Sequence, residues 1–292
     1  MGFTLFSPTY ELHGYTRMKQ IDLTSWEQFE DQVLQLTRER SELRGKKGVY
    51  VSDYLFRGQP NCSWHLTTTL ERQASGPLTL DNYYRTVCAT KPQVETFTGA
   101  RWEIPSYSDY KDWASKTELF PPSEFLAYEY FVYLRHHGFP SPLLDWTRSP
   151  YVAAYFAFRD FRTEDEMVSI FAYCEYTTGH KTWASDSPLI SVLGPYVRSH
   201  RRHFQQQSQY TICTIRAADK ITYACHEDVF AKNDQDQDVL WKFNIPASER
   251  RKALARLEQY NINAFSLFGS EESLMETLSI REILLKNDGF RG

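Results

Sequence analysis

The sequence predicts an α+β fold in one mixed domain, and two observations carry this prediction. Helical and strand patterns follow one another irregularly along the 292 residues, without the regular strand–helix–strand units of a doubly wound sheet. Four strand patterns then gather in the second half of the chain, over residues 167–176, 209–215, 220–225 and 239–246. Since 41% of the residues are hydrophobic, the chain can bury a substantial core around such a sheet.

The chain contains no internal repeat and no low-complexity linker, which favours a single domain. We place that domain at residues 21–285, with an N-terminal extension over residues 1–20 and a C-terminal tail over residues 286–292. The oligomeric state is left open.

The composition excludes several classes of protein. With 33 Lys and Arg against 37 Asp and Glu, the net charge of −4 gives no overall positive field to hold nucleic acid or an anionic membrane. The five cysteines are odd in number and widely spaced, which argues against a disulfide framework and against a zinc site. No stretch approaches the roughly 18 apolar residues of a membrane span, and the N-terminus lacks the pattern of an export signal. We therefore expect a cytoplasmic protein.

The first element is an amphipathic helix within residues 23–36. Thr24 stands three residues before Glu27, the spacing of a capping box, and one apolar face follows, made of Trp26, Phe29, Val33 and Leu34. Residues 48–58 then predict a strand that ends at a glycine.

The middle of the chain is harder to assign. Residues 73–120 are polar and aromatic, are interrupted by prolines and show only weak periodicity. Residues 123–137 predict a buried helix, which opens on Ser123 as a cap and stops before Gly138. Another helix follows the last strand pattern, over residues 248–260.

A junction between a strand and a helix is the most informative segment. Leu143 and Leu144 start a short buried strand, and Ser149 followed by Pro150 predicts the cap and first position of a helix. The small residues Ala153, Ala154 and Ala157 would let this helix lie close to a sheet. The junction displays Asp145, Trp146, Thr147 and Ser149, whose short polar groups beside unpaired helix N–H groups suit an anion or a ribose. The alternative is that Asp145 caps loop amides and Ser149 serves only its helix.

Several stretches together resemble the FRG family, and the resemblance covers roughly residues 20–285. Phe56, Arg57 and Gly58 form the signature that names the family, and it continues through Gln59. The second and most specific signature is matched by His136, Gly138, LLDWT at residues 143–147, Ser149 and Pro150, with Arg135 in place of the usual glutamine. A weaker third signature is matched by Arg202, Gln206, Gln207 and Tyr210, with Ser208 in place of glycine. The last, INAFSLF at residues 262–268, is followed by Gly269 where the family has proline.

The order of these signatures is similar to that of ADP-ribosyltransferase folds. The resemblance implies a central, largely antiparallel split sheet flanked by helices, with NAD as co-substrate and no metal. It further implies an ADP-ribosyltransferase or an NAD glycohydrolase, whose acceptor is a protein, a nucleic acid or water. A toxin or defence effector is one role that such an activity serves.

The same resemblance assigns roles to single residues. Arg57, Asp145, Ser149 and Gln206 are the expected catalytic residues, and Arg57 with Gly58 and Gln59 would hold a phosphate or ribose close to the backbone. His136 would orient Asp145 or contact a ribose, Thr147 and Ser149 would bond the nicotinamide ribose, and Trp146 or Tyr155 would stack on the nicotinamide ring. The alternative for Arg57 is a structural ion pair with Asp145 or with a glutamate.

The expected glutamate of such enzymes has no motif-matched counterpart. The aligned strand offers Gln206, Gln207 and Gln209, and a neutral amide cannot stabilise positive charge as a carboxylate does. Either Asp145, Glu271 or Glu272 takes that part, or the domain binds without catalysing.

A second hypothesis is a non-catalytic module that binds nucleic acid or protein. Residues 198–210 interleave arginines and histidines with Phe204 and Tyr210, as an RNA-contacting stretch does. The acidic net charge counts against this hypothesis.

Overall fold

The computed structural model confirms the α+β class, with one mixed sheet flanked by helices in a single domain. The structure describes residues 17–46, 48–76, 79–116, 125–160, 162–163, 166–179, 181, 187–194, 201–217, 220–231 and 237–286.

The sheet has eight strands in the order β1-β8-β4-β2-β3-β6-β5, and β7 pairs with β6 beside this path. The strands are β1 (Met18–Asp22), β2 (Leu55–Gln59), β3 (Leu144–Thr147), β4 (Met167–Cys174), β5 (Leu189–Leu193), β6 (Ser208–Ala217), β7 (Lys220–Tyr223) and β8 (Val239–Pro246). β1 runs parallel to β8, while the other described pairs are antiparallel, so the sheet is mixed. β1 starts at Met18, which brings three residues of the expected N-terminal extension into the sheet.

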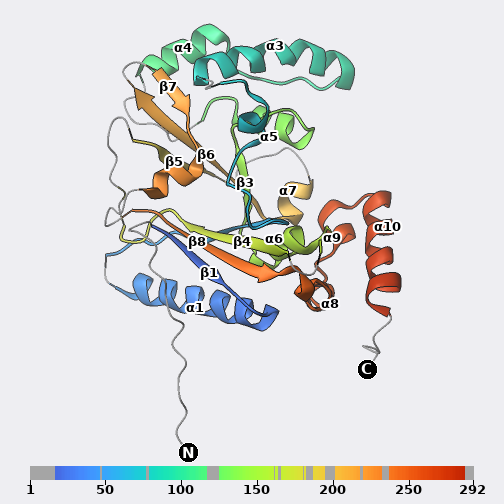
Figure 1. The fold of residues 1–292 in the computed structure, drawn as a ribbon. Coiled ribbons are helices and arrows are strands. Elements are labelled where there is room, and N and C mark those ends of the chain that lie inside the picture. The colour runs from blue at the N-terminus through green and yellow to red at the C-terminus, as the bar shows by residue number, and fades with distance from the viewer. Residues whose placement is uncertain are drawn as a thin grey trace, which may run out of the picture.

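The sheet is weakly joined between β2 and β3. These two strands share a single register pair, Phe56 with Thr147, whereas β2 pairs with β4 along all of its length. The sheet therefore consists of one half with β1, β8, β4 and β2 and another half with β3, β6, β5 and β7, which lie at different heights in Figure 1.

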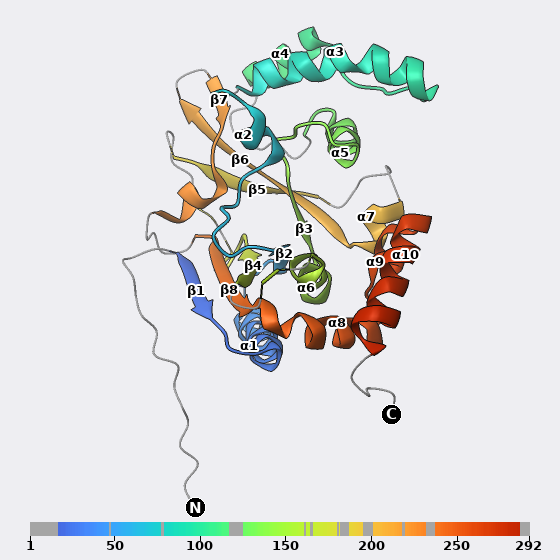
Figure 2. The same ribbon diagram turned by 45° about the vertical axis from the view of Figure 1, so that its right-hand side comes forward.

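Helices cover the two halves separately. The described α-helices are α1 (Trp26–Gly45), α2 (Thr69–Gln73), α3 (Leu80–Thr98), α4 (Tyr107–Lys116), α5 (Tyr128–His136), α6 (Pro150–Phe158), α7 (Arg201–Gln205), α8 (Arg250–Gln259), α9 (Ala264–Phe268) and α10 (Glu271–Ser279). The described helical segments of other types are η1 (His226–Ala231), η2 (Ala247–Glu249) and η3 (Ile280–Leu284). In Figures 1 and 2, α3, α4 and α5 lie beside the β5–β6–β7 half, and α1 and α8 lie beside the β1–β8–β4 half.

Three clusters of buried side chains fill the domain. One packs α1, α6 and α8 against β2, β4 and β8, and a second packs α3, α4 and α5 against β6. The third lies between the two halves of the sheet, where Leu55 of β2 and Trp146 of β3 meet Ile190 of β5 and Leu240 of β8. The halves that share one register pair are thus held together mainly by apolar burial.

The first helix is confirmed, with two corrections. Its N-cap is Ser25 rather than Thr24, because the Ser25 hydroxyl accepts from the Gln28 N–H at 3.3 Å. Leu34 is 52% exposed, and Leu36 takes its expected place in the core. A face of period 3.6 that starts at Trp26 and Phe29 continues through Val33 to Leu36 and turns Leu34 outward.

Residues 73–120, which showed weak periodicity, contain the long helices α3 and α4. The first half of α3 buries Leu80, Tyr83, Tyr84 and Val87, an i, i+3, i+4, i+7 pattern. Pro92 lies within α3, beyond this buried face. Pro92 suggested a break in the secondary structure, but α3 continues past it to Thr98.

The buried helix expected over residues 123–137 is observed as α5, from Tyr128 to His136. Residues 123 and 124 lie outside the described residues, and Ala127 precedes the helix with a left-handed φ of 59°. Phe131 is fully buried, as predicted, and Gly138 has a φ of 83° just after the helix, a conformation that favours glycine.

Among the described residues, no helix is long and apolar enough to cross a membrane. All five cysteines are free thiols.

Candidate functional site

The position of β2 against α6 depends on Gly58. A Cβ atom at Gly58 would lie 1.9 Å from the Ala153 carbonyl oxygen and 2.7 Å from the Ala157 nitrogen, so only glycine allows this approach. The small residues of α6 therefore do what the sequence predicted. The expectation that Gly58 admits a ligand to the backbone is corrected, because the α6 backbone occupies that space.

Arg57 and Asp145 meet where β2 and β3 separate. Arg57 Nη1 donates to the Asp145 carbonyl oxygen and to Asp145 Oδ1, both at 2.8 Å. Arg135, at the end of α5, donates to the same Oδ1 and also to Thr69 Oγ1 at 3.2 Å. The side chains of Arg57 and Arg135 are 14% and 12% exposed, while that of Asp145 is 48% exposed. We call these three residues the Arg57 cluster.

The Arg57 cluster has one more positive charge than negative charge. Partial removal from water would raise the pKa of Asp145, but the charges of Arg135 and Arg57 outweigh this and hold that pKa well below its usual range. Burial lowers the pKa of Arg57, yet a guanidinium starts so high that it stays charged. The cluster therefore attracts an anion to its half-exposed side.

Two buried polar atoms beside the cluster have no hydrogen-bond partner within the described residues. They are Arg57 Nε, a donor, and Gln59 Oε1, an acceptor. Residues 57 and 59 point to the same face of β2, because side chains alternate along a strand. Gln59 uses its amide nitrogen to reach the His65 carbonyl at 3.3 Å. A buried donor and acceptor left unpaired on one face are a feature that a polar ligand would satisfy.

A chain of buried polar side chains lies behind the cluster. Trp146 Nε1 donates to Thr211 Oγ1 at 2.7 Å, and Thr211 Oγ1 is 2.9 Å from Nε2 of the fully buried His226. Burial, followed by the positive charges of Arg57 and Lys181, lowers the pKa of His226 to about 3. His226 is therefore neutral at physiological pH and adds no charge near the cluster.

Trp146 and Tyr155 do not have the stacking role expected of them. The Trp146 ring is 3% exposed and packs 5.6 Å from Tyr173, between the two sheet halves. Tyr155 is 1% exposed, and its hydroxyl donates to Glu276 of α10 at 2.7 Å. Neither ring has a face left for a nicotinamide, so both are reassigned to core packing.

Thr147 and Ser149 shape the start of α6. Thr147 Oγ1 accepts from the Ser149 N–H at 3.1 Å, and Ser149 Oγ accepts from the Val152 N–H at 3.3 Å. Ser149 is thus the N-cap of α6, as predicted. Its oxygen bonds its own helix, which is the alternative that the sequence analysis gave for this residue. His136 bonds Tyr210 at 2.6 Å; it is the neighbouring Arg135 that contacts Asp145.

Gln209, rather than Gln206, lies beside the junction. Gln206 extends its amide to the Leu267 carbonyl at 3.2 Å, on α9. Gln209 is 3% exposed and pairs in register with Trp146. When the side-chain amide of Gln209 is oriented so that its oxygen faces hydrogen-bond donors, that oxygen accepts from the Arg148 guanidinium at 3.3 Å. The motif match pointed to Gln206, which precedes β6, and only the pairing of β3 with β6 shows that Gln209 is the glutamine beside the junction.

The remaining candidate carboxylates lie apart from these contacts. Glu271 and Glu272 are exposed in the first turn of α10. Glu276, which belongs to none of the motifs, accepts from Arg159 at 2.7 and 2.6 Å and holds α10 against the end of α6.

The basic stretch 198–210 is only partly described, since residues 195–200 lie outside the described residues. Within it, Arg202 donates to the Phe268 carbonyl at 3.3 Å and lies over the Phe268 ring. His203 is 8% exposed and stacks on Tyr210. These two side chains therefore serve internal packing.

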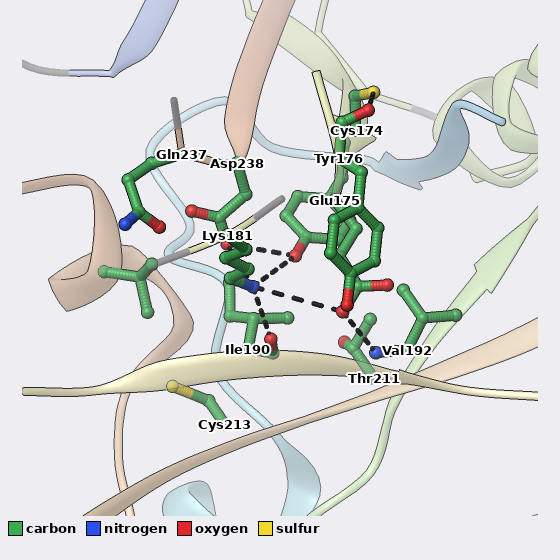
Figure 3. Close-up of polar contacts among 12 residues, drawn as sticks. Cys174, Glu175, Tyr176, Lys181, Ile190, Val192, Thr211, Cys213, Gln237 and Asp238 are labelled. Carbon is green, nitrogen blue, oxygen red and sulfur yellow. Dashed lines mark hydrogen bonds and ion pairs between the residues drawn. The ribbon is translucent and has the colours of Figure 1, made fainter. Parts of the chain in front are cut away.

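A second buried polar cluster, missed by the sequence reasoning, lies at the end of β4 (Figure 3). Lys181 Nζ is 2.9 Å from Asp238 Oδ2, 2.6 Å from the Ile190 carbonyl and 4.0 Å from Glu175 Oε1. Tyr173 also donates to Asp238 Oδ2, at 3.0 Å. Burial raises the pKa of Glu175 to about 7, against the opposing charge of Lys181.

Comparison with known proteins identifies the segment that holds the Arg57 cluster. No curated protein and no solved structure matches the chain. The family model described as FRG domain matches residues 52–166, which include Arg57, Arg135 and Asp145. The resemblance that the sequence motifs suggested is thereby confirmed over residues 52–166, the segment that the FRG domain model matches.

Proposed function

We propose that the chain binds an NAD-type dinucleotide where β2 and β3 separate, and cleaves its bond to nicotinamide as an ADP-ribosyltransferase or an NAD glycohydrolase. The observation that carries this proposal is the Arg57 cluster, in which two largely buried guanidiniums share one half-exposed carboxylate. NAD presents a pyrophosphate to the uncompensated positive charge, and a guanidinium fork suits phosphate oxygens.

The unpartnered atoms on β2 support a ligand with both anionic and hydroxyl groups. Arg57 Nε would donate to a phosphate oxygen, and Gln59 Oε1 would accept from a ribose hydroxyl. The Ser149 oxygen accepts from α6, and its hydroxyl keeps a proton to donate toward a ribose oxygen. These roles use residues from β2 and from the β3–α6 junction, as the resemblance implies.

The chemistry rests on Asp145, which is the carboxylate of the cluster. When the glycosidic carbon–nitrogen bond breaks, its electron pair leaves with nicotinamide and the ribose gains oxocarbenium character. Arg57 and Arg135 both bond Oδ1 of Asp145 and keep the carboxylate ionised, so its other oxygen, Oδ2, would lie against that positive charge and stabilise it. Water or another acceptor then bonds to the ribose carbon and releases its proton to the solvent. Gln209 is neutral and adds hydrogen bonding only.

The test is incubation of the purified protein with NAD labelled in its ADP-ribose part, with and without cell lysate. Free nicotinamide with a labelled macromolecule indicates a transferase, and free nicotinamide without one indicates a glycohydrolase. Saturable binding without nicotinamide release assigns the domain to the non-catalytic alternative. Absence of both binding and release contradicts the proposal.

Matched variants locate the activity within the chain. Asp145→Asn should abolish nicotinamide release, because an amide cannot stabilise the developing charge. Glu271→Gln and Glu272→Gln are the controls, since both side chains are exposed on α10, and release should be unchanged. Loss of release in either control, with Asp145→Asn still active, would move the catalytic carboxylate to α10.

A further inference from the structure

The face of β2 opposite Arg57 borders a pocket that the proposed function does not use. Arg57 and Phe56 point to opposite faces, because side chains alternate along a strand. The Phe56 side contains a pocket of about 270 Å³ between β2, α1 and the start of α6. Phe56 and Tyr54 line it from one side, and Val33 and Leu36 of α1 line it from the other.

The pocket has an apolar floor and a charged rim. Tyr54, Phe56, Val33 and Leu36 are each at most 9% exposed, so they form its floor. Arg148, the residue that follows β3, also lines the pocket and is exposed at its rim.

Positive charge dominates this rim. Arg40 of α1 lines the pocket opposite the FRG segment, and its Nη1 pairs with Asp53 Oδ1 at 2.8 Å. Arg44 pairs with the same Asp53 oxygen at 2.9 Å, so that carboxylate is already shared between two cations. Arg148 adds a further positive charge. The buried Nε of Arg40 has no hydrogen-bond partner within the described residues.

We propose that this pocket binds a small amphiphilic anion, a single aromatic ring that carries a phosphate or a carboxylate. The ring would lie against Tyr54 and Phe56, and the anionic group would lie between Arg40 and Arg148. The size favours one ring, because a volume of about 270 Å³ falls just below the roughly 300–1,000 Å³ of sites for drug-sized ligands.

The two walls of the pocket come from different parts of the chain. Tyr54, Phe56 and Arg148 lie within the matched FRG segment, whereas α1 precedes it. The helix that supplies Arg40 thus determines which anion fits, and the FRG segment supplies the aromatic floor. The site is separate from the Arg57 cluster and does not depend on NAD binding.

The experiment is a calorimetric titration with phenyl phosphate at low salt. Inorganic phosphate, which lacks the ring, and phenol, which lacks the charge, are the ligand controls. Phenyl phosphate should bind saturably with one equivalent and at least tenfold more tightly than either control. Equal affinity for phenyl phosphate and inorganic phosphate, or no saturable binding of phenyl phosphate, overturns the proposal.

Variants of the rim test the location. Arg40→Gln and Arg148→Gln should each weaken phenyl phosphate binding at least fivefold. Arg44→Gln is the matched control, because it also removes one cation that pairs with Asp53. Arg44 does not line the pocket, so the affinity for phenyl phosphate should change less than twofold. Equal losses in Arg40→Gln and Arg44→Gln would mean general electrostatic attraction and overturn the site.

A steric variant keeps every charge in place. Thr37 is exposed on α1 and lines the pocket, so Thr37→Phe should fill the space without disturbing the core and should abolish phenyl phosphate binding. Arg57→Lys should leave that binding unchanged. Undiminished binding in Thr37→Phe, or loss in Arg57→Lys alone, would place the ligand elsewhere, and circular dichroism checks that each variant is folded.

Discussion

At Arg57, the ion pair that the sequence raised as an alternative is present, but it does not make Arg57 indispensable to the fold. Removing one partner of an isolated buried pair leaves a charge stranded and costs about 3–5 kcal/mol. Here Asp145 is half exposed and retains Arg135, so no charge would be stranded by loss of Arg57. Stability and ligand binding can therefore be separated at this residue.

Arg57→Lys should lower the free energy of unfolding by less than about 1.5 kcal/mol, the worth of one net hydrogen bond. NAD affinity should fall by roughly 1.5–3 kcal/mol, or about 10- to 150-fold, because lysine lacks the planar fork. Thermal melting and calorimetric titration measure the two quantities. Unchanged NAD affinity with a collapsed melting temperature would assign Arg57 to the scaffold.

Gly58→Ala should destabilise the protein by about 3 kcal/mol, at the upper end of typical overpacking costs. The added Cβ would meet backbone atoms of α6, which cannot move aside as a flexible side chain can. Gly45→Ala is the control, since nothing lies within 4 Å of a Cβ at the end of α1. Urea denaturation compares them, and similar midpoints for the two variants would refute the close approach of α6.

At the scale of elements, α5 illustrates how a short helix is held by aromatic packing. Phe131 is fully buried, with the rings of Phe125 and Tyr83 centred 5.1 and 5.2 Å away. α5 also carries Arg135 at its end, so the same helix positions one member of the Arg57 cluster.

Phe131→Ala should cost roughly 3–5 kcal/mol, through lost burial and the cavity left behind. Phe97→Ala on α3 is the matched control, since Phe97 is 92% exposed and its loss should stay within about 0.5 kcal/mol. Chemical denaturation provides both values. A Phe131→Ala variant as stable as Phe97→Ala would show that α5 does not pack as described.

At the scale of the whole molecule, polar contacts bridge the ends of the two sheet halves. β4 and β5 are far apart in the strand order, yet Glu175 after β4 accepts from the Val192 N–H of β5 at 3.2 Å. Lys181 bonds the Ile190 carbonyl of β5 and also pairs with Asp238 before β8 (Figure 3). Among the described residues, the charged groups that act on the pKa of Glu175 are Lys181 and the more distant carboxylate of Asp238.

This bridge predicts a pH dependence of stability. The folded pKa of Glu175, about 7, exceeds its ordinary value of 4.5, so the folded state binds the proton more tightly than the unfolded state. The stability from this group is fully present below about pH 4.5 and is lost as the pH rises to about 7. Glu175→Gln stays uncharged, and its stability relative to wild type should rise by up to about 3 kcal/mol across that range.

The measurement is the free energy of unfolding of both proteins at matched pH values. His226 acts in the opposite sense: its pKa is lowered to about 3, so its contribution to stability is lost as the pH falls below about 6.5. Because both proteins contain His226, its effect cancels in the difference. A difference that does not change between pH 4.5 and 7 would contradict the raised pKa of Glu175.

The sequence by itself determined the features that depend on neighbouring residues. The cap at Ser149, Pro150 at the first turn of α6, the small face of that helix and the strand at residues 239–246 are local patterns, and each was predicted correctly. The FRG motifs were recognised for the same reason, since the two that lie within the matched segment consist of short contiguous runs.

Only the tertiary structure decided which distant residues meet. The single register pair of β2 with β3 places Arg57 beside Asp145, and the end of α5 brings Arg135 to the same oxygen. Gln209 replaced Gln206 because Gln206 lies in the turn between α7 and β6 and reaches the Leu267 carbonyl, whereas Gln209 lies on β6 and pairs with Trp146. Gly58 and Trp146 lost their expected ligand roles because burial depends on what packs against a strand, and that is a property of the whole chain.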